Sequence, residues 1–101
     1  MASLYLSEYA VIGTPGPGPD GHQAPLEPAQ VEQLVAISGS STQSSPFASS
    51  TKLVRVEVDS ICSILFGANP TAYTGAKRLA AGQTEYFAVV PGHRLAVISN
   101  V

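Results

Sequence analysis

The sequence predicts an all-β protein: a small β-sandwich or jelly-roll-like module with an extended N-terminal arm. Apolar and polar residues alternate with period two through most of residues 52–101, as they do in half-buried strands. Turn residues recur about every 8–12 positions, which is typical of a sandwich, and no long segment shows the period of a helix. We therefore expect residues 1–28 to form the arm and a Pro/Gly-rich tether, and residues 29–101 to form the β-sandwich domain.

The arm begins with residues 3–12, SLYLSEYAVI, which predict a strand, with a helix as the alternative. Both faces of this strand would carry apolar side chains, which is typical of a segment covered on two sides. We expect it to lie against a neighbouring chain. The candidate protein-interface residues, from this arm and two later loops, are Leu4, Tyr5, Leu6, Tyr9, Val11, Phe47 and Tyr73.

The tether, residues 13–28, consists largely of proline and glycine. Proline has no amide donor and glycine loses the most conformational freedom on ordering, so this composition excludes a helix or an interior strand. The Pro-Gly alternation lacks the strict three-residue period of collagen. We interpret the segment as an extended tether, and we expect the domain to stay folded when residues 1–28 are removed.

Residues 31–38, VEQLVAIS, predict a strand with Val31, Val35 and Ile37 on one face, and a short helix over 28–36 is the alternative. The following residues, 39–51, predict a polar, Ser-rich loop that carries a single aromatic residue, Phe47. We expect this side chain to fill the edge of the core, with an exposed contact as the alternative.

The second half of the chain gives the clearest pattern. Residues 52–59, KLVRVEVD, predict a half-buried strand with its valines on one face and its charged residues on the other. Residues 60–67, SICSILFG, are apolar on both faces and predict a central, covered strand. Residues 84–90 and 94–100 predict two further strands.

Pro91 and Gly92 suit the central positions of a type II turn, because glycine supplies the positive φ that this turn requires. We expect the turn to join the last two strands in a C-terminal hairpin. Glu85 and Arg94 would then lie near opposing positions and form a weak cross-strand pair.

The amino-acid composition restricts the kinds of partner that the protein can bind. Charged residues make up 12% of the chain, against about 25% in an average soluble domain, so we expect a neutral surface that other protein covers. Only five residues are Lys or Arg, which gives no electrostatic footprint for nucleic acid. No apolar run is long enough to cross a bilayer, and the first residues do not resemble a signal peptide.

The sequence offers little chemistry, and we expect no catalytic residue, no cofactor and no metal site. His22 and His93 lie in the tether and in a turn, whereas a zinc site needs three or four clustered ligands. No strand-elbow-helix motif presents a nucleophilic serine. Glu57 and Asp59 share a strand face and could bind a cation, but a solvated face around Arg55 is the favoured interpretation.

Two other features have ordinary structural interpretations. Cys62 lies in an apolar run and is expected to be a buried, inert thiol, since no other cysteine is present to form a disulfide. The tyrosines are dispersed along the chain. They fit the edges of a core, and a platform that stacks sugars or bases is the alternative.

Two stretches, TKLVRVEVDSICSILFGANPTA and RLAAGQTEYFAVVPGHRLAVIS, carry a family resemblance. In both the chain and the family, a strand, an apolar strand and a G-x-x-P-T-A turn precede R-L-x-A-x-x-x-E-Y-F-x-V-x-P-G and a terminal A-V-I strand. The matching positions are Gly67, Pro70, Thr71, Ala72, Arg78, Leu79, Ala81, Glu85, Tyr86, Phe87, Val89, Pro91, Gly92, Ala96, Val97 and Ile98. About half of the chain thus resembles small structural proteins encoded near the capsid genes of tailed bacteriophages.

The resemblance implies a cement or decoration protein that is made in the host cytoplasm and binds the exterior of the capsid. Its partner would be the major capsid protein, and it would form a homo-oligomer, with a trimer favoured, and bind neither nucleic acid nor membrane. An aromatic and aliphatic arm on a flexible tether suits attachment by strand addition.

Three alternatives stay open at this point. The chain could be a head–tail junction, tail or head-fibre component of the virion. It could instead be a carbohydrate-binding β-sandwich that uses surface tyrosines such as Tyr5 and Tyr73. An enzyme is the least favoured class, because histidines, cysteines and clustered acids are scarce.

Overall fold

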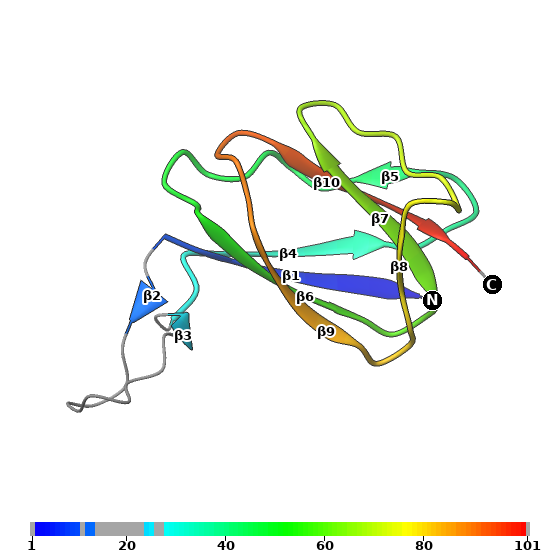
Figure 1. Ribbon diagram of the computed structural model, residues 1–101, viewed down its shortest axis with the longest axis horizontal. Coiled ribbons are helices and arrows are strands. Elements are labelled where there is room, and N and C mark those ends of the chain that lie inside the picture. Colours follow the sequence, from blue (N-terminus) through cyan, green and yellow to red (C-terminus); the bar gives the residue numbers. More distant parts are fainter. Residues whose placement is uncertain (1, 11, 14–23, 26–27, 101) are drawn as a thin grey trace.

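The computed structural model describes residues 2–10, 12–13, 24–25 and 28–100. They form two four-stranded antiparallel sheets that pack against each other, and a separate two-stranded ribbon (Figure 1). The predicted all-β sandwich is confirmed.

The two sheets draw their strands from the whole length of the chain. The first sheet contains, in spatial order, β4 (Val31–Ala36), β1 (Ser3–Tyr9), β6 (Leu53–Val58) and β9 (Thr84–Ala88). The second contains β5 (Thr42–Gln43), β10 (Arg94–Ser99), β7 (Cys62–Gly67) and β8 (Lys77–Leu79). The ribbon pairs β2 (Ile12–Gly13) with β3 (Ala24–Pro25) and lies beyond one end of the sandwich (Figure 1).

The chain winds between the sheets in the manner of a jelly roll. From β4 to β10 it crosses to the other sheet at each connection except the one from β7 to β8, which are neighbours in the second sheet. This alternation between two antiparallel sheets is the jelly-roll arrangement. β1 and β4, the strands on either side of the ribbon, pair with each other in the first sheet.

β1 corrects the expectation of a separate N-terminal arm. The strand predicted within residues 3–12 exists, but it pairs with β4 on one side and with β6 on the other. Its Leu4 and Leu6 side chains are fully buried among the side chains of the core. A strand that is paired on both edges and buried on its inner face belongs to the domain, because it satisfies its backbone groups within the chain itself.

The core lies between the sheets and follows the predicted alternation. In β6, Val54, Val56 and Val58 are buried while Arg55 and Glu57 point outward, as period two requires. The strand predicted within residues 31–38 is confirmed in place of the helix. The full cluster comprises Leu4, Leu6, Val35, Ile37, Phe47, Val54, Val56, Val58, Cys62, Ile64, Leu79, Leu95 and Val97.

The predicted C-terminal hairpin is wrong, although its turn is present. The His93 amide donates to the Val90 carbonyl at 3.1 Å, and Gly92 has φ of 85°. However, β9 pairs with β6 in the first sheet, while β10 pairs with β7 and β5 in the second. Type II turns splay their flanking strands, whereas two-residue hairpins use the mirror-image turn types, so this turn carries the chain across the sandwich.

The second positive-φ glycine marks the same kind of crossing. Gly82 has φ of 80°, and the Gln83 amide donates to the Ala80 carbonyl at 3.0 Å. This turn leads from β8 in the second sheet to β9 in the first. Because the hairpin does not form, Glu85 and Arg94 do not pair with each other. The side-chain amide of Gln83 donates to Glu85, and the Arg94 guanidinium donates to the side chain of Gln43.

We predict that removal of residues 1–9 unfolds the protein, because the first sheet then loses an interior strand and β4 loses the one strand that pairs with it among the described residues. Far-UV circular dichroism with urea titration should show no cooperative transition. Full-length Tyr5→Ser, which changes an exposed side chain of the same strand, should keep a normal transition. A truncated chain that still unfolds cooperatively would restore the arm interpretation.

Candidate functional site

The two outer faces of the sandwich differ, and this difference locates the candidate site. On the outer side of the second sheet, Ser63 of β7 and Ala96 of β10 have no exposed surface. The long connection between β7 and β8, residues 68–76, covers them. The outer side of the second sheet is thus buried at its centre, at Ser63 and Ala96, whereas Leu65 and Ile98 are half-buried and Arg78 is exposed.

Polar contacts hold this covering segment in place. Ser63 donates its hydroxyl to the Thr74 carbonyl at 3.2 Å, and the Asn100 amide donates to Ser63 at 2.8 Å. At the other end of the segment, the backbone amide of Ala72 donates to the Ser41 hydroxyl at 2.8 Å, and the side-chain amide of Gln43 donates to the Pro70 carbonyl at 2.7 Å. The connection is thus tied to the interior strand β7 at one end and to the edge strand β5 with its preceding residue Ser41 at the other.

The outer face of the first sheet has large exposed side chains instead. Leu34 of β4 is 65% exposed, Tyr5 of β1 is 49% exposed and Tyr86 of β9 is 51% exposed. Leu34 and Tyr5 are direct cross-strand neighbours, and Tyr86 lies opposite Arg55 of β6. We call this surface the open face and define it by Tyr5, Leu34, Arg55, Glu57 and Tyr86.

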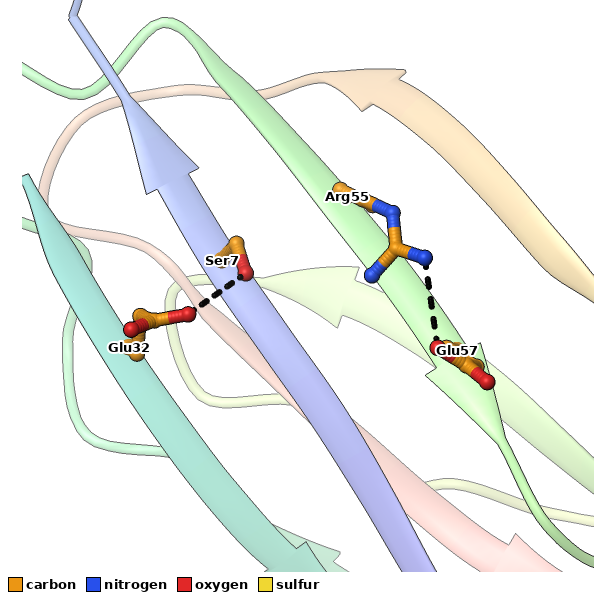
Figure 2. Close-up of polar contacts among 4 residues, drawn as sticks. All are labelled: Ser7, Glu32, Arg55 and Glu57. Carbon is orange, nitrogen blue, oxygen red and sulfur yellow. Dashed lines mark hydrogen bonds and ion pairs between the residues drawn. The ribbon is translucent and has the colours of Figure 1, made fainter. Parts of the chain in front are cut away.

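Polar and charged side chains also project from the strands of this sheet (Figure 2). Arg55 and Glu57 project from the same side of β6 and form an ion pair with 3.2 Å between Nη2 and Oε1. On the neighbouring strands, the Ser7 hydroxyl donates to Glu32 at 3.4 Å. Burial works to lower the pKa of Arg55, but the hydrogen bond with Tyr86 and the pairing with Glu57 raise it more. The guanidinium of Arg55 therefore stays charged, and its partner on the face is the Glu57 carboxylate.

The structure separates the sequence-predicted interface residues into two groups. Leu4, Leu6 and Phe47 are core residues, and Tyr9 is buried as well. Their side chains are covered by the chain itself, so they do not form a partner surface. For Phe47 the core interpretation is confirmed, and its ring lies 6.3 Å from that of Phe66.

The remaining candidates lie in different places. Tyr5 belongs to the open face, whereas Tyr73 is 58% exposed in the connection that covers the second sheet. The two tyrosines therefore do not share a sheet, and the structure does not bring them together as one platform. Val11 lies outside the described residues.

A buried polar cluster centred on Glu8 escaped the sequence analysis. Glu8 has no exposed surface. Its Oε1 accepts from the Thr51 hydroxyl at 2.6 Å and from the Ala48 amide at 2.9 Å, and its Oε2 accepts from the Gln33 side chain at 2.7 Å. All three partners donate, which is the pattern that the ionised form of a carboxyl group satisfies.

The cluster fixes the loop between β5 and β6 to the first sheet. The side chain of Gln33 also makes two hydrogen bonds with the backbone of Ser45: it accepts from the amide at 2.8 Å and donates to the carbonyl at 3.3 Å. Gln30 donates to Thr51 at 3.0 Å. The signal was available in the sequence, since Glu8 shares the parity of Leu4 and Leu6 and must point to the inner side of the strand.

The polar groups of the Glu8 cluster are used for structural contacts. Both carboxylate oxygens of Glu8 accept hydrogen bonds from structural donors, and no buried side-chain nitrogen or oxygen lacks a hydrogen bond among the described residues. The same residues contain no group of three or more potential metal ligands. They also contain no helix that is long and apolar enough to span a membrane.

Cys62 is buried at the inner side of β7, as expected. Burial, with a smaller contribution from the negative charge of Asp59, raises the pKa of this thiol to about 11. The thiol is therefore protonated at neutral pH, and a protonated thiol is a poor nucleophile.

No protein-family model, curated protein or solved structure matches this chain.

We predict that Glu8→Ala lowers the free energy of unfolding by about 2–3 kcal/mol, because the buried Thr51 hydroxyl and two partly buried donors lose their acceptor. Urea unfolding measures this loss. Glu32→Ala, which removes a carboxylate from the outer side of the same sheet, should change stability by no more than about 0.5–1 kcal/mol. Equal losses in the two variants would show that the Glu8 cluster has no special structural role.

We predict that Cys62 does not react with Ellman's reagent at pH 8 in the folded protein and reacts fully in urea. The raised pKa keeps the thiol protonated at this pH, and the core excludes the reagent. Reactivity in the folded state should rise only as the pH approaches the pKa. Rapid labelling at pH 8 without denaturant would contradict the burial of this side chain.

Proposed function

We propose that this chain is a non-enzymatic virion structural protein that binds and stabilises a bacteriophage capsid as a cement or decoration protein. In this proposal the open face of the first sheet contacts the major capsid protein. The observation that carries the proposal is the asymmetry of the sandwich. A connection is hydrogen-bonded over the centre of one outer face, whereas the other outer face exposes the large side chains of Tyr5, Leu34 and Tyr86.

The composition of the open face supports a protein partner. Interfaces are enriched in tyrosine, other aromatic residues and arginine relative to the remaining surface. Tyr5 and Tyr86 flank the Arg55–Glu57 pair on adjoining strands. A partner that covers this face would bury both rings and would find the guanidinium already oriented by its neighbours, which reduces the side-chain entropy lost on binding.

Most positions that carry the phage resemblance belong to the β-sandwich framework, and few belong to the open face. Among its matching positions, Leu79, Ala96 and Val97 are buried strand residues and Gly92 holds the positive-φ turn. Tyr86 is the matching residue that belongs to the open face. Jelly-roll sandwiches recur among viral capsid and lectin domains, so the fold is compatible with this function without specifying it.

One observation favours a second candidate function, carbohydrate binding. Tyr5 and Tyr86 are exposed on the same sheet face beside charged side chains, and sugar sites combine aromatic rings with such polar groups. The pair that the structure offers for this purpose is Tyr5 and Tyr86, since Tyr73 lies in a different part of the molecule.

We predict that the protein co-purifies with the virus particles whose genome encodes it and that the open face holds it there. Particles produced without the chain are incubated with recombinant protein, and occupancy is measured by sedimentation and mass spectrometry. The double variant Tyr5→Ser/Tyr86→Ser should lower the affinity at least about tenfold, because truncation of a buried interface aromatic costs about 1–2 kcal/mol or more. Tyr73→Ser, equally exposed elsewhere, should bind normally.

Three outcomes would overturn the proposal. The chain could be absent from purified particles, or it could be found on the tail or at the head–tail junction, which would favour the other virion functions. Specific binding on a glycan array that the double variant abolishes, without any binding to particles, would favour the carbohydrate function.

A further inference from the structure

β4 is a free edge of the first sheet. It pairs with β1 along one side, and among the described residues no strand pairs with its other side. The Ile37 amide donates to the Ala2 carbonyl at 3.0 Å. This bond shows which residues of β4 direct their backbone groups toward β1 and which direct them away from it. Glu32, Leu34 and Ala36 consequently direct their backbone N–H and C=O groups away from β1.

This edge carries only one of the features that usually prevent pairing with another chain, the charged side chain of Glu32. The other such features are lysine, proline, a bulge or a very short strand. β4 has six residues, contains neither lysine nor proline, and keeps an uninterrupted register with β1. The outer edges of the second sheet are the two-residue β5 and the three-residue β8. At the opposite edge of the first sheet, Lys77 Nζ lies 5.8 Å from the ring of Phe87 in β9, which places a cation beside that strand.

We propose that β4 pairs antiparallel with β4 of a second copy of this chain, with Leu34 on the two-fold axis. In this register Leu34 faces Leu34 of the second copy, and Glu32 faces Ala36. All three outward-facing residues of each strand are then paired, which gives about six main-chain hydrogen bonds. A pairing centred on Glu32 would instead place two carboxylates opposite each other, and like charges in that position are destabilising.

The side chains complement this backbone pairing. Tyr5 lies directly beside Leu34 on the open face. The two-fold axis therefore joins two such pairs into one apolar stripe, Tyr5–Leu34 followed by Leu34–Tyr5 of the second copy, and an isologous interface requires self-complementarity of this kind. The Leu34 side chain, which is exposed in the single chain, is then covered in part by Leu34 of the second copy.

The pairing has a consequence for the proposed function and deepens it by naming one partner. The first sheets of the two copies become one continuous sheet, and their open faces point in the same direction. A capsid surface would then meet two linked copies of the face, and the second contact would form at a high effective concentration. The dimer itself rests on the β4 geometry, while this use of it rests on the proposed function.

A cysteine on the axis tests the register directly. Hydrogen-bonded antiparallel pairs have Cα atoms about 5.5 Å apart, within the range of about 4.4–6.8 Å that a disulfide spans. Leu34→Cys should therefore oxidise to a covalent dimer, read on a non-reducing gel. Tyr73→Cys, similarly exposed in a loop, should not, and Cys62 is too buried to interfere.

A charge on the axis tests the association itself. Leu34→Lys would place two cations against each other, and the dissociation constant measured by sedimentation velocity should rise at least about tenfold. Tyr73→Lys should leave the wild-type dimer unchanged, and the two variants should have similar circular dichroism spectra.

A wild-type protein that is monomeric at high concentration would overturn the inference. A trimer that persists in Leu34→Lys would overturn it as well and would agree with the trimer that the phage resemblance implies. A dimer that forms by β4 but never binds particles would leave the pairing intact and remove the capsid function. The two proposals therefore fail separately.

Discussion

The structure depends on the placement of β1 between β4 and β6. Pairing on both edges gives the first sheet its centre and sets the positions of two very different side chains on one strand. On the inner side, Glu8 reaches the loop that precedes β6 and accepts three hydrogen bonds from it and from β4. On the outer side, Tyr5 lies at the middle of the open face. One strand thus links the core, the closing loop and the candidate site.

The contrast between the two outer faces explains the unusual composition. The chain covers its second sheet with a connection that is held by small polar residues such as Ser41, Ser63 and Asn100. This internal covering needs few charged residues. On the first sheet the charges that do occur are arranged around Arg55 and Glu57. The low charge content therefore reflects a protein that covers one side with its own chain and presents a mixed apolar and charged surface on the other.

Local patterns in the sequence predicted the elements, whereas the pairing of those elements required information from distant residues. The alternation of Val54, Val56 and Val58 was sufficient to predict β6 and its buried face. The Pro91-Gly92 turn was also predicted, but its connection was not, because a local turn does not show which sheet receives the next strand. Of the candidate interface residues, Leu4 and Leu6 were misjudged for the same reason. Their apolar character indicates burial, and the sequence alone does not show whether the covering atoms belong to the same chain.

The position of β1 also affects how the molecule is made. A ribosome delivers this segment well before β6, and the hydrogen bond from Ser3 to Asp59 joins residues that are 56 positions apart. Contacts between such distant parts of a chain form slowly, because a large loop must close first. During synthesis β1 can pair with β4 first, and its second edge stays unpaired until the ribosome has also delivered β6.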